Sequence, residues 1–323
     1  MTAIRIGTRG SALALWQART VGALIEASGR AVEIVVIRTG GDRLQQAPLS
    51  EVGGKRLFVK EIEDALLARD IDVAVHSAKD MSAVLPAGLD IAAVLPREDP
   101  RDAFVLPRGR ETSDFAGTLA RLEGDAVIGT GSIRRSAQLI GLLPHARFAG
   151  IRGNVDTRLR KLDAGDFDAL VLAAAGLRRL DLAFRISAAI PLEVCVPAPG
   201  QGIVAVETRS EDTAARQALA GADDPATAVL FDAERAVVVR LGGGCQLPLG
   251  AVAVHEGRSI VMHGLVASPD GRRIIRRQAS GPRDDPSGVG QRLADALADA
   301  GALEILDGVR ATANTVDGRG AQD

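Results

Sequence analysis

The stretch IRIGTRGSALALWQARTVGALIEASG, residues 4–29, contains the pattern that decides the fold. Ile4 to Gly7 is a short apolar run typical of a buried strand, and the turn TRG follows it. Ser11 can then cap a helix, because apolar residues recur at helical spacing from there until Gly29 ends it. A strand followed by a helix, when repeated, indicates a parallel sheet covered by helices.

The same alternation of strand and helix continues through the first two thirds of the chain. Further strands are expected over residues 33–37, 71–75, 126–129 and 169–173. The loop-rich segment LPREDPRD near residue 100 separates two units of similar build. After about residue 222 come a long helix closed by Gly242, three strand-like segments, a final helix and a polar tail. We therefore predict two α/β domains and a small α+β domain, with boundaries at 1–100, 101–200 and 222–323.

Composition and charge exclude several classes of protein. The 323 residues are 46% hydrophobic and 25% charged, which is ordinary for a globular chain and excludes global disorder. The net charge of -2 leaves no overall positive field for a nucleic-acid backbone, and 2% aromatic residues leave few surfaces for base stacking. No apolar run could span a bilayer or serve as a signal peptide. With two isolated cysteines, these features predict a cytoplasmic protein that binds neither nucleic acid nor membrane.

Polar side chains gather where the predicted strands end. In open parallel sheets, ligands bind beyond the carboxyl ends of the strands. Residues 130–185 hold ten Lys or Arg and five Asp, so a local charge of +5 is concentrated there. Arginines beside helix N-termini bind carboxylates or phosphates, whereas a single arginine could equally solvate a helix face. Five clusters together favour a ligand with several negative groups: Thr8, Arg9 and Ser11; His76, Ser77, Lys79 and Asp80; Thr130, Ser132, Arg134 and Arg135; Arg152, Gly153 and Asn154; Arg178 and Arg179.

The motifs for nucleotides and metals are incomplete. VGGKR lacks the first glycine and the Ser or Thr of a Walker loop, and GTGSIRR lacks the third glycine of a dinucleotide fingerprint. The four histidines do not have the spacing of metal ligands, and His76 beside a buried strand is expected to be structural. The sequence therefore predicts neither a nucleotide cofactor nor a metal.

Two residues are candidates for chemistry. Asp80, next to Lys79 at a strand end, could stabilise a positive centre or relay protons, although an ion pair or a helix cap would fit as well. Cys245 follows three glycines in LGGGCQLPLG, a loop that could carry a thiol into a cleft. Taken alone, a helix end followed by a buried cysteine explains Cys245 better. Cys195, among valines and prolines, is expected to be buried and structural.

The order of the motifs is more specific than any one of them. Along the chain stand TRGSALALWQA, GGKRLFVKEIEDALL, HSAKD, REDPRDAF, GTGSIRR, RGNVDTRL, AGLRRL, PAPGQG, ERA and LGGGCQLPLG. This order closely resembles the porphobilinogen deaminase family, also called hydroxymethylbilane synthases, over nearly the whole chain. The resemblance implies a transferase of haem and tetrapyrrole biosynthesis, which joins four porphobilinogen units head to tail and releases ammonia to give 1-hydroxymethylbilane.

The resemblance also implies roles for individual residues. The family holds a dipyrromethane primer by a thioether on the loop cysteine, here Cys245, and its catalytic aspartate falls on Asp80. Lys55 and Phe58 match the family's mobile loop and the helix start after it, and Gln201 matches the segment between domains. The family's contacts to acetate and propionate groups match Arg9, Ser11, Ser77, Lys79, Thr130, Ser132, Arg134, Arg135, Arg152, Arg158 and Arg179.

The resemblance further implies a monomer with three domains. The first two resemble type II periplasmic binding proteins, and residues of about 201–221 complete the first. Five residues depart from the common family pattern, namely Glu51, Arg56, Met81, Ser82 and Gly131.

Two other functions remain as alternatives from the residues alone. Two α/β lobes around an arginine cleft could bind a carboxylate ligand without converting it, but such a protein needs no thiol facing the cleft. A hydrolase with Cys245 as nucleophile would need a nearby histidine, for which His255 and His263 are the candidates.

Overall fold

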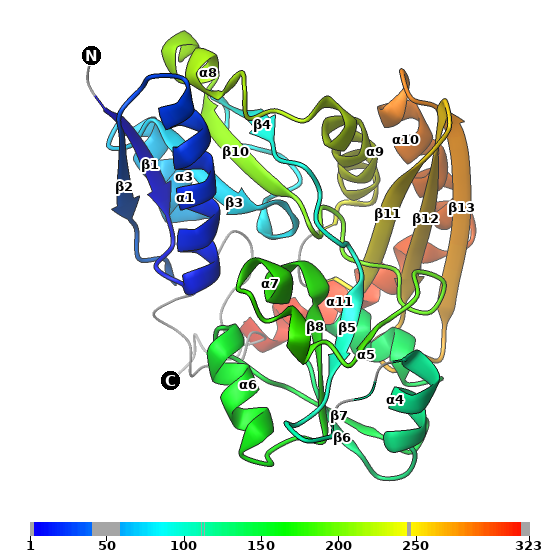
Figure 1. The fold of residues 1–323 in the computed structure, drawn as a ribbon. Helices are drawn as coiled ribbons and strands as arrows, with labels where there is room; N and C mark the ends of the chain where they lie inside the picture. The colour runs from blue at the N-terminus through cyan, green and yellow to red at the C-terminus, as the bar shows by residue number, and fades with distance from the viewer. Residues whose placement is uncertain (1–2, 41–58, 111, 113, 244–246, 318–323) are drawn as a thin grey trace.

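The structure is a computed structural model that describes residues 3–40, 59–110, 112, 114–243 and 247–317. Its strands form two five-stranded sheets and one three-stranded sheet. Figure 1 shows the first sheet and its helices beside the three-stranded sheet, with the second five-stranded sheet below. The described part of the chain thus has three sheet-centred units, as the sequence predicts.

The first sheet has the strand order β2-β1-β3-β10-β4. β1, β2 and β3 are parallel, whereas β10 runs antiparallel to both β3 and β4. The strands are β1 (Ile4–Thr8), β2 (Val32–Val36), β3 (Val73–Ser77), β4 (Leu89–Val94) and β10 (Val204–Arg209). The helices of this unit are α1 (Ala12–Ala27), α3 (Lys60–Leu67) and α8 (Thr213–Leu219). Ser11 caps α1 as predicted, because its Oγ accepts a hydrogen bond from the backbone N–H of Ala14 at 3.2 Å.

The second sheet repeats this arrangement with the order β7-β6-β8-β5-β9. Its strands are β5 (Asp102–Val105), β6 (Val127–Gly129), β7 (Arg147–Ala149), β8 (Ala169–Ala173) and β9 (Ala188–Ala189). The helices here are α4 (Phe115–Arg121), α5 (Ile133–Leu139), α6 (Val155–Asp163) and α7 (Ala174–Arg179). In each five-stranded sheet the fourth strand in this order is antiparallel to its neighbours. The sequence pattern predicts parallel sheets, whereas the sheets in the structure are mixed. Strand direction is set by long-range pairing, which local periodicity does not report.

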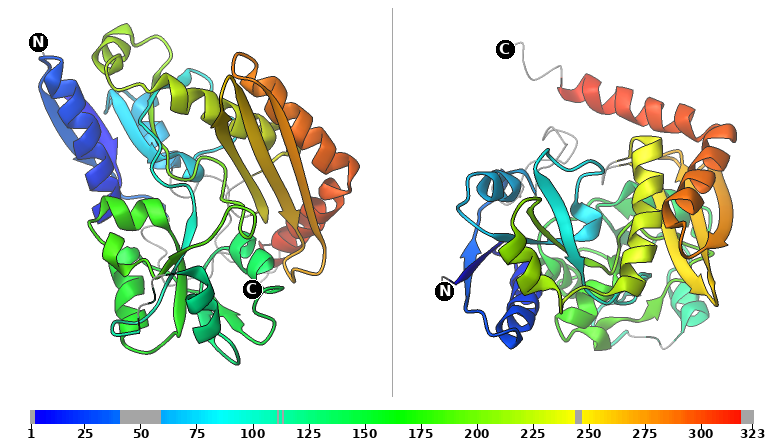
Figure 2. Two further views of the ribbon diagram at one scale, coloured as in Figure 1. Left: turned by 45° about the vertical axis from the view of Figure 1, so that its right-hand side comes forward. Right: turned by 90° about the horizontal axis from the view of Figure 1, so that it is seen from above.

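The C-terminal unit packs three helices against an antiparallel sheet. Its elements are α9 (Pro225–Leu241), β11 (Leu249–Glu256), β12 (Ser259–Ala267), β13 (Ile274–Pro282), α10 (Pro286–Asp299) and α11 (Ala302–Asp317). Gly242 ends α9 with a left-handed backbone (φ 65°), as its position predicts. The single final helix expected from the sequence is wrong, because the chain turns at Ala300 and Gly301 and starts α11. The expected polar tail is also helical as far as Asp317 (Figure 2).

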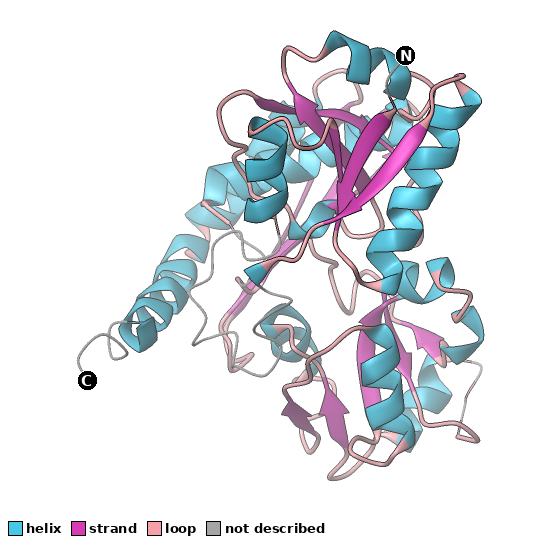
Figure 3. Cartoon of the chain, turned by 90° about the vertical axis from the view of Figure 1, so that its left-hand side faces the viewer, coloured by secondary structure: helices cyan, strands magenta, loops and turns pink. Residues whose placement is uncertain are grey.

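Each unit has its own buried core. In the first, Ile6, Val73 and Val206 of the sheet pack against Ile25 of α1 and Leu219 of α8. The second buries Phe104 and Ile128 against Leu139, and the third buries Met262 against Val237 and Leu293. These separate cores explain why three units form side by side, and Figure 3 shows the two α/β lobes one above the other.

Candidate functional site

A cavity of about 420 Å³ lies among the three units. This volume is in the usual range for a small-molecule site. The first lobe contributes residues after β1 and β3, the second contributes residues after β6, β7 and β8, and the C-terminal unit contributes part of α9. Each of the five strand-end clusters therefore contributes to one cavity, as expected. Four members of these clusters do not line it, namely Thr8, His76, Thr130 and Arg178.

The segment after β3 forms one wall of the cavity. A single 3-10 turn, Ala78–Asp80, follows the strand, so Lys79 and Asp80 both line the cavity. The loop containing Gly200 packs directly on this turn, because a Cβ at Gly200 would lie 3.0 Å from the backbone nitrogen of Lys79. Gly200 also has φ 74°, which side-chain-bearing residues rarely adopt. Gln17 donates from Nε2 to Ser77 Oγ at 2.9 Å and fixes the start of the turn.

Positive charge predominates in the cavity. In the described part of the chain, eight Lys or Arg residues line the cavity and two Asp do. The cations are Arg9, Lys79, Arg134, Arg135, Arg152, Arg158, Arg179 and Arg235, and the carboxylates are Asp80 and Asp156. Burial, together with the charge of Arg135, lowers the pKa of Lys79 from 10.5 to about 8. Burial likewise lowers the pKa of Arg158 to about 10, although Asp80 opposes this shift. Such repulsion between cations is relieved by a ligand with several negative groups.

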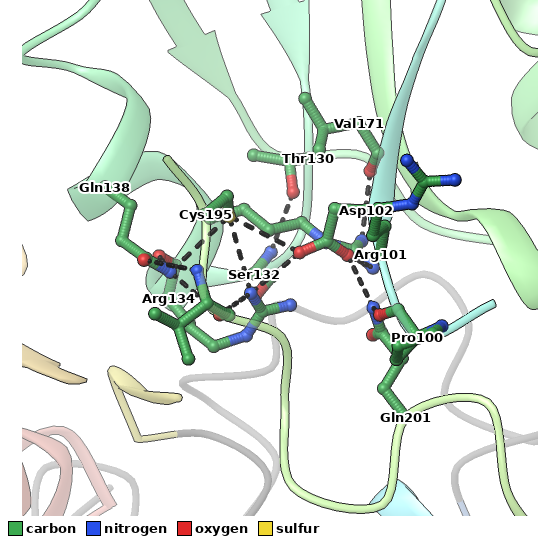
Figure 4. Close-up of polar contacts among 12 residues, drawn as sticks. Pro100, Arg101, Asp102, Thr130, Ser132, Arg134, Gln138, Val171, Cys195 and Gln201 are labelled. Carbon is green, nitrogen blue, oxygen red and sulfur yellow. Dashed lines mark hydrogen bonds and ion pairs between the residues drawn. The ribbon is translucent and has the colours of Figure 1, made fainter. Parts of the chain in front are cut away.

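A buried carboxylate holds two of these arginines (Figure 4). Asp102, which is 0% exposed, accepts from Arg134 Nη1 at 2.7 Å and from Arg135 Nε at 2.9 Å. The two arginines keep the pKa of Asp102 well below its usual range despite its burial. Cys195 lies in the same network and is buried, as predicted, with its pKa raised to about 12 by burial. A thiol with this pKa is not a nucleophile at neutral pH.

Polar contacts also join the units around the cavity. The guanidinium of Arg179 on α7 lies 5.6 Å from the ring centroid of Trp16 on α1 and joins the two lobes. Glu234 on α9, fully buried, accepts from Arg97 at 2.6 Å and from the backbone N–H of Gly200 at 2.6 Å. The cavity is thus held by contacts between units as well as within them.

The structure brings most of the predicted site residues together. The following line the cavity: Arg9, Ser11, Ser77, Lys79, Asp80, Ser132, Arg134, Arg135, Arg152, Arg158, Arg179 and Gln201. Thr130 is buried behind this set, and its Oγ1 accepts from the backbone N–H of Ser132. Ser132 precedes α5, but its hydroxyl makes no cap hydrogen bond within the described chain. Lys55, Phe58 and Cys245 lie outside the described residues.

Arg235 lines the cavity although it was not among the predicted site residues. Arg235 on α9 donates to the backbone carbonyls of Ser82 and Ala83, which follow the turn containing Asp80. Its guanidinium also lies 5.5 Å from the ring centroid of Phe231. Arg235 stands in the motif ERA, which carried part of the resemblance but had no predicted role.

Three of the five departures from the family pattern lie in the described part of the chain. Met81 is buried against Phe231 and other apolar side chains, and the carbonyl of Ser82 accepts from Arg235. A Cβ at Gly131 would lie 3.0 Å from the carbonyl oxygen of Ile151, so glycine suits this tight contact. Glu51 and Arg56 are outside the described residues.

Within residues 3–40, 59–110, 112, 114–243 and 247–317, no three His, Cys, Asp or Glu side chains are arranged to bind a metal ion. No helix in the same ranges is long and apolar enough to cross a membrane.

The fold and the cavity define a class of protein, namely a two-lobed α/β protein with a third unit and a cationic cleft for a polyanionic ligand. Comparison with protein families shows which family within this class the chain matches. Residues 4–217 match the sequence model of the porphobilinogen deaminase dipyrromethane cofactor binding domain, and residues 228–299 match that of the C-terminal domain. The chain belongs to the porphobilinogen deaminase family, whose members are transferases of tetrapyrrole biosynthesis.

Individual relatives agree with this assignment. The porphobilinogen deaminase of Acidithiobacillus ferrooxidans is 48% identical over 309 residues, which cover 95% of this chain and 98% of that protein. The porphobilinogen deaminase of Thiobacillus denitrificans is 46% identical over 313 residues, which cover 96% and 100%. The prediction of family made from the motifs is confirmed.

Solved structures show more distant similarity. The second substrate binding domain of a putative amino acid ABC transporter from Streptococcus pneumoniae has a TM-score of 0.43 at 13% identity, covering 68% of this chain and 91% of that one. The Bordetella pertussis BvgS VFT2 domain has a TM-score of 0.40 at 15% identity, covering 68% and 86%. At these TM-scores the similarity has no bearing on function.

Proposed function

We propose that the cleft joins porphobilinogen units on a dipyrromethane primer bound to Cys245, with Asp80 as the catalytic residue. The observation that carries this proposal is the position of Asp80, a carboxylate that lines the cavity together with eight cationic side chains of the described residues. Arginines and Lys79 bind the acetate and propionate groups of primer and substrate. Each added unit forms one carbon–carbon bond and releases one ammonia.

The donor set of the cleft fits a dipyrromethane. Such a group carries several carboxylates and no metal-binding function, and the cavity offers guanidinium, ammonium and hydroxyl donors. Arg9, Arg152 and Arg158 would bind carboxylates from different walls of the cavity. When bound, the dipyrromethane supplies the electron-rich pyrrole carbon at which the first bond is made.

Asp80 acts on the substrate through its charge. Loss of ammonia leaves positive charge on the substrate, and a carboxylate at the cavity wall stabilises that charge. The same oxygens accept a proton when the pyrrole carbon regains its aromatic state. The cations of the cavity bind the carboxylate substituents, so Asp80 is the group suited to stabilise charge at the reacting centre.

The direct test of this proposal is the intact mass of the purified protein under denaturing conditions. We expect a mass excess equal to two linked pyrrole units on the peptide containing Cys245, and turnover of porphobilinogen by the same preparation. An unmodified Cys245 that also stays unmodified after incubation with porphobilinogen would favour a two-lobed carboxylate-binding protein without catalysis.

Loss of a cleft arginine is expected to weaken substrate binding. Arg158 lines the cavity, whereas Arg160 is exposed on the same helix, α6. We expect Arg158→Leu to raise KM for porphobilinogen by about 10- to 100-fold, because a charge-assisted hydrogen bond contributes roughly 1.5–3 kcal/mol. Steady-state kinetics of Arg158→Leu and of the control Arg160→Leu would check this. Equal KM values in the two variants would contradict the assignment of Arg158.

The buried charge of Lys79 predicts a change of stability with pH in the primer-free protein. The pKa of Lys79 is about 8 in the fold, below its ordinary value of 10.5. Between these values the unfolded chain binds more protons, so the free energy of unfolding rises as pH increases through about 8. We expect Lys79 to add roughly 1 kcal/mol between pH of about 7.5 and 9.5, allowing for solvent screening.

Denaturant unfolding would measure this change in Cys245→Ala protein with and without Lys79→Met. The difference in unfolding free energy between the two variants should grow with pH, because other titrating groups cancel. A difference that is independent of pH would show that Lys79 keeps its ordinary pKa.

Four further assignments are part of the proposal. The domain boundaries are residues 1–100 with about 201–221, residues 101–200 and residues 222–323, which the three sheets support. The chain is a monomer and binds no nucleic acid, as the family resemblance and the net charge of -2 suggest. It acts in the cytoplasm, where two isolated cysteines stay reduced.

A further inference from the structure

Asp102 lies where the two lobes are connected, and it takes no direct part in the proposed reaction. It begins β5, where the chain has just crossed from the first lobe to the second. Gln201, where the chain returns, donates from Nε2 to Asp102 Oδ1 at 2.9 Å and to the carbonyl of Pro100 at 2.7 Å. One carboxylate therefore joins the two segments that connect the lobes (Figure 4).

The same carboxylate holds two cavity arginines on one side. Arg134 and Arg135 are neighbours at the start of α5, and each donates to a different oxygen of Asp102. Arg135 Nη1 also donates to the carbonyl of Val171 at 3.0 Å, and Arg134 Nη1 to that of Val196 at 2.7 Å. These contacts fix the arginines at the back of the cavity, which both of them line.

The charges in this cluster do not balance. Two guanidinium groups share one carboxylate, so the buried cluster retains one excess positive charge. Lys79 adds a second, because its Nζ donates to Gln201 Oε1 at 3.4 Å and Gln201 in turn donates to Asp102. A buried cluster with excess charge requires counter-charge, and carboxylates of a bound ligand provide it.

We propose that Asp102 is a positioning residue that orients Arg134 and Arg135 toward the carboxylates of the bound ligand. Through its hydrogen bond with Gln201, Asp102 also orients Lys79 toward these carboxylates. It prevents the two arginines from separating under their mutual repulsion while leaving the net charge positive. This inference rests on the proposed function, because the ligand carboxylates are those of primer and substrate. It assigns a role in substrate binding to a residue outside the cavity lining.

The test is Asp102→Asn, which preserves shape but removes the charge. Its amide N–H groups would face guanidinium N–H groups, so we expect the arginines to shift and KM for porphobilinogen to rise at least about tenfold, with a smaller change in kcat. The matched control is Asp163→Asn, because Asp163 pairs with the buried Arg185 in the same lobe away from the cavity. This control should lower the unfolding temperature and leave KM unchanged.

The pH profile separates positioning from a purely structural role. Arg134 and Arg135 lower the pKa of Lys79, whereas Asp80 and Asp102 raise it. Removal of the charge of Asp102 should therefore move the alkaline limb of kcat/KM to lower pH, and Asp163→Asn should not. Wild-type KM together with a wild-type alkaline limb in folded Asp102→Asn would overturn the proposal.

Two controls complete the experiment. If Asp102→Asn does not fold, Asp102→Glu tests the same point, because it keeps the charge but displaces the arginines. A raised KM with the wild-type alkaline limb would support the proposal, and a wild-type KM would overturn it. Wild-type protein without turnover or primer would instead contradict the proposed function, so the two failures are distinguishable.

Discussion

Replacement of Asp80 by alanine is expected to lower kcat by about 10²- to 10⁴-fold while fold and bound primer are retained. This range is typical of the loss of a general acid–base or charge-stabilising group. Asp80 lies at the end of a single 3-10 turn whose position is set by Gln17, Gly200 and the strand β3. The backbone of that turn does not depend on the carboxylate, so the variant should fold normally.

The measurement combines kinetics with intact mass. Asp156→Ala is the matched control, because Asp156 on α6 is the other carboxylate that lines the cavity among the residues the structure describes. We expect this control to stay within a few-fold of wild-type turnover. Near-normal turnover in Asp80→Ala, or an equal loss in both variants, would contradict the role assigned to Asp80. Loss of primer in Asp80→Ala would assign Asp80 to primer assembly instead.

Much of the fold follows from local sequence patterns. The alternation of apolar runs and helical periods predicts the units, and Ser11 and Gly242 mark helix ends that the structure contains. The antiparallel direction of β10 and β5 does not follow, because it depends on pairing with strands far along the chain. The break between α10 and α11 was also missed, since the apolar period continues across Gly301.

Some site residues also follow from local sequence, whereas others depend on contacts between distant parts of the chain. Arg9, Lys79 and Arg152 follow strand ends, so the strand-end rule places them at one edge. Asp102 was not among the predicted site residues, and Gln201 was predicted only from the family resemblance. The partners of these two side chains are 32 to 122 residues away along the chain. Arg235 follows no strand and reaches the cavity only through the packing of α9 against the first lobe. Contacts of this kind depend on how the units dock, which no local pattern encodes.

Replacement of Cys245 by alanine is expected to abolish covalent primer and to reduce activity to background. A thioether needs a sulfur atom at this position, and alanine leaves nothing for the primer to attach to. The chain has two cysteines, which makes Cys195→Ala a matched control. Cys195 is buried beside Asp102, where its raised pKa disfavours the thiolate that attachment requires.

Intact mass and peptide mapping of both variants would distinguish the two thiols. Cys195→Ala should retain the full mass excess and lose only stability, because it removes a buried thiol from the network around Arg134 and Gln138. Cys245→Ala should have the mass of its unmodified sequence even after incubation with porphobilinogen. A mass excess that persists in Cys245→Ala would place the primer elsewhere. Because the cavity cations would then still need carboxylate partners, such a result would refute the attachment site and leave the polyanion cleft unaffected.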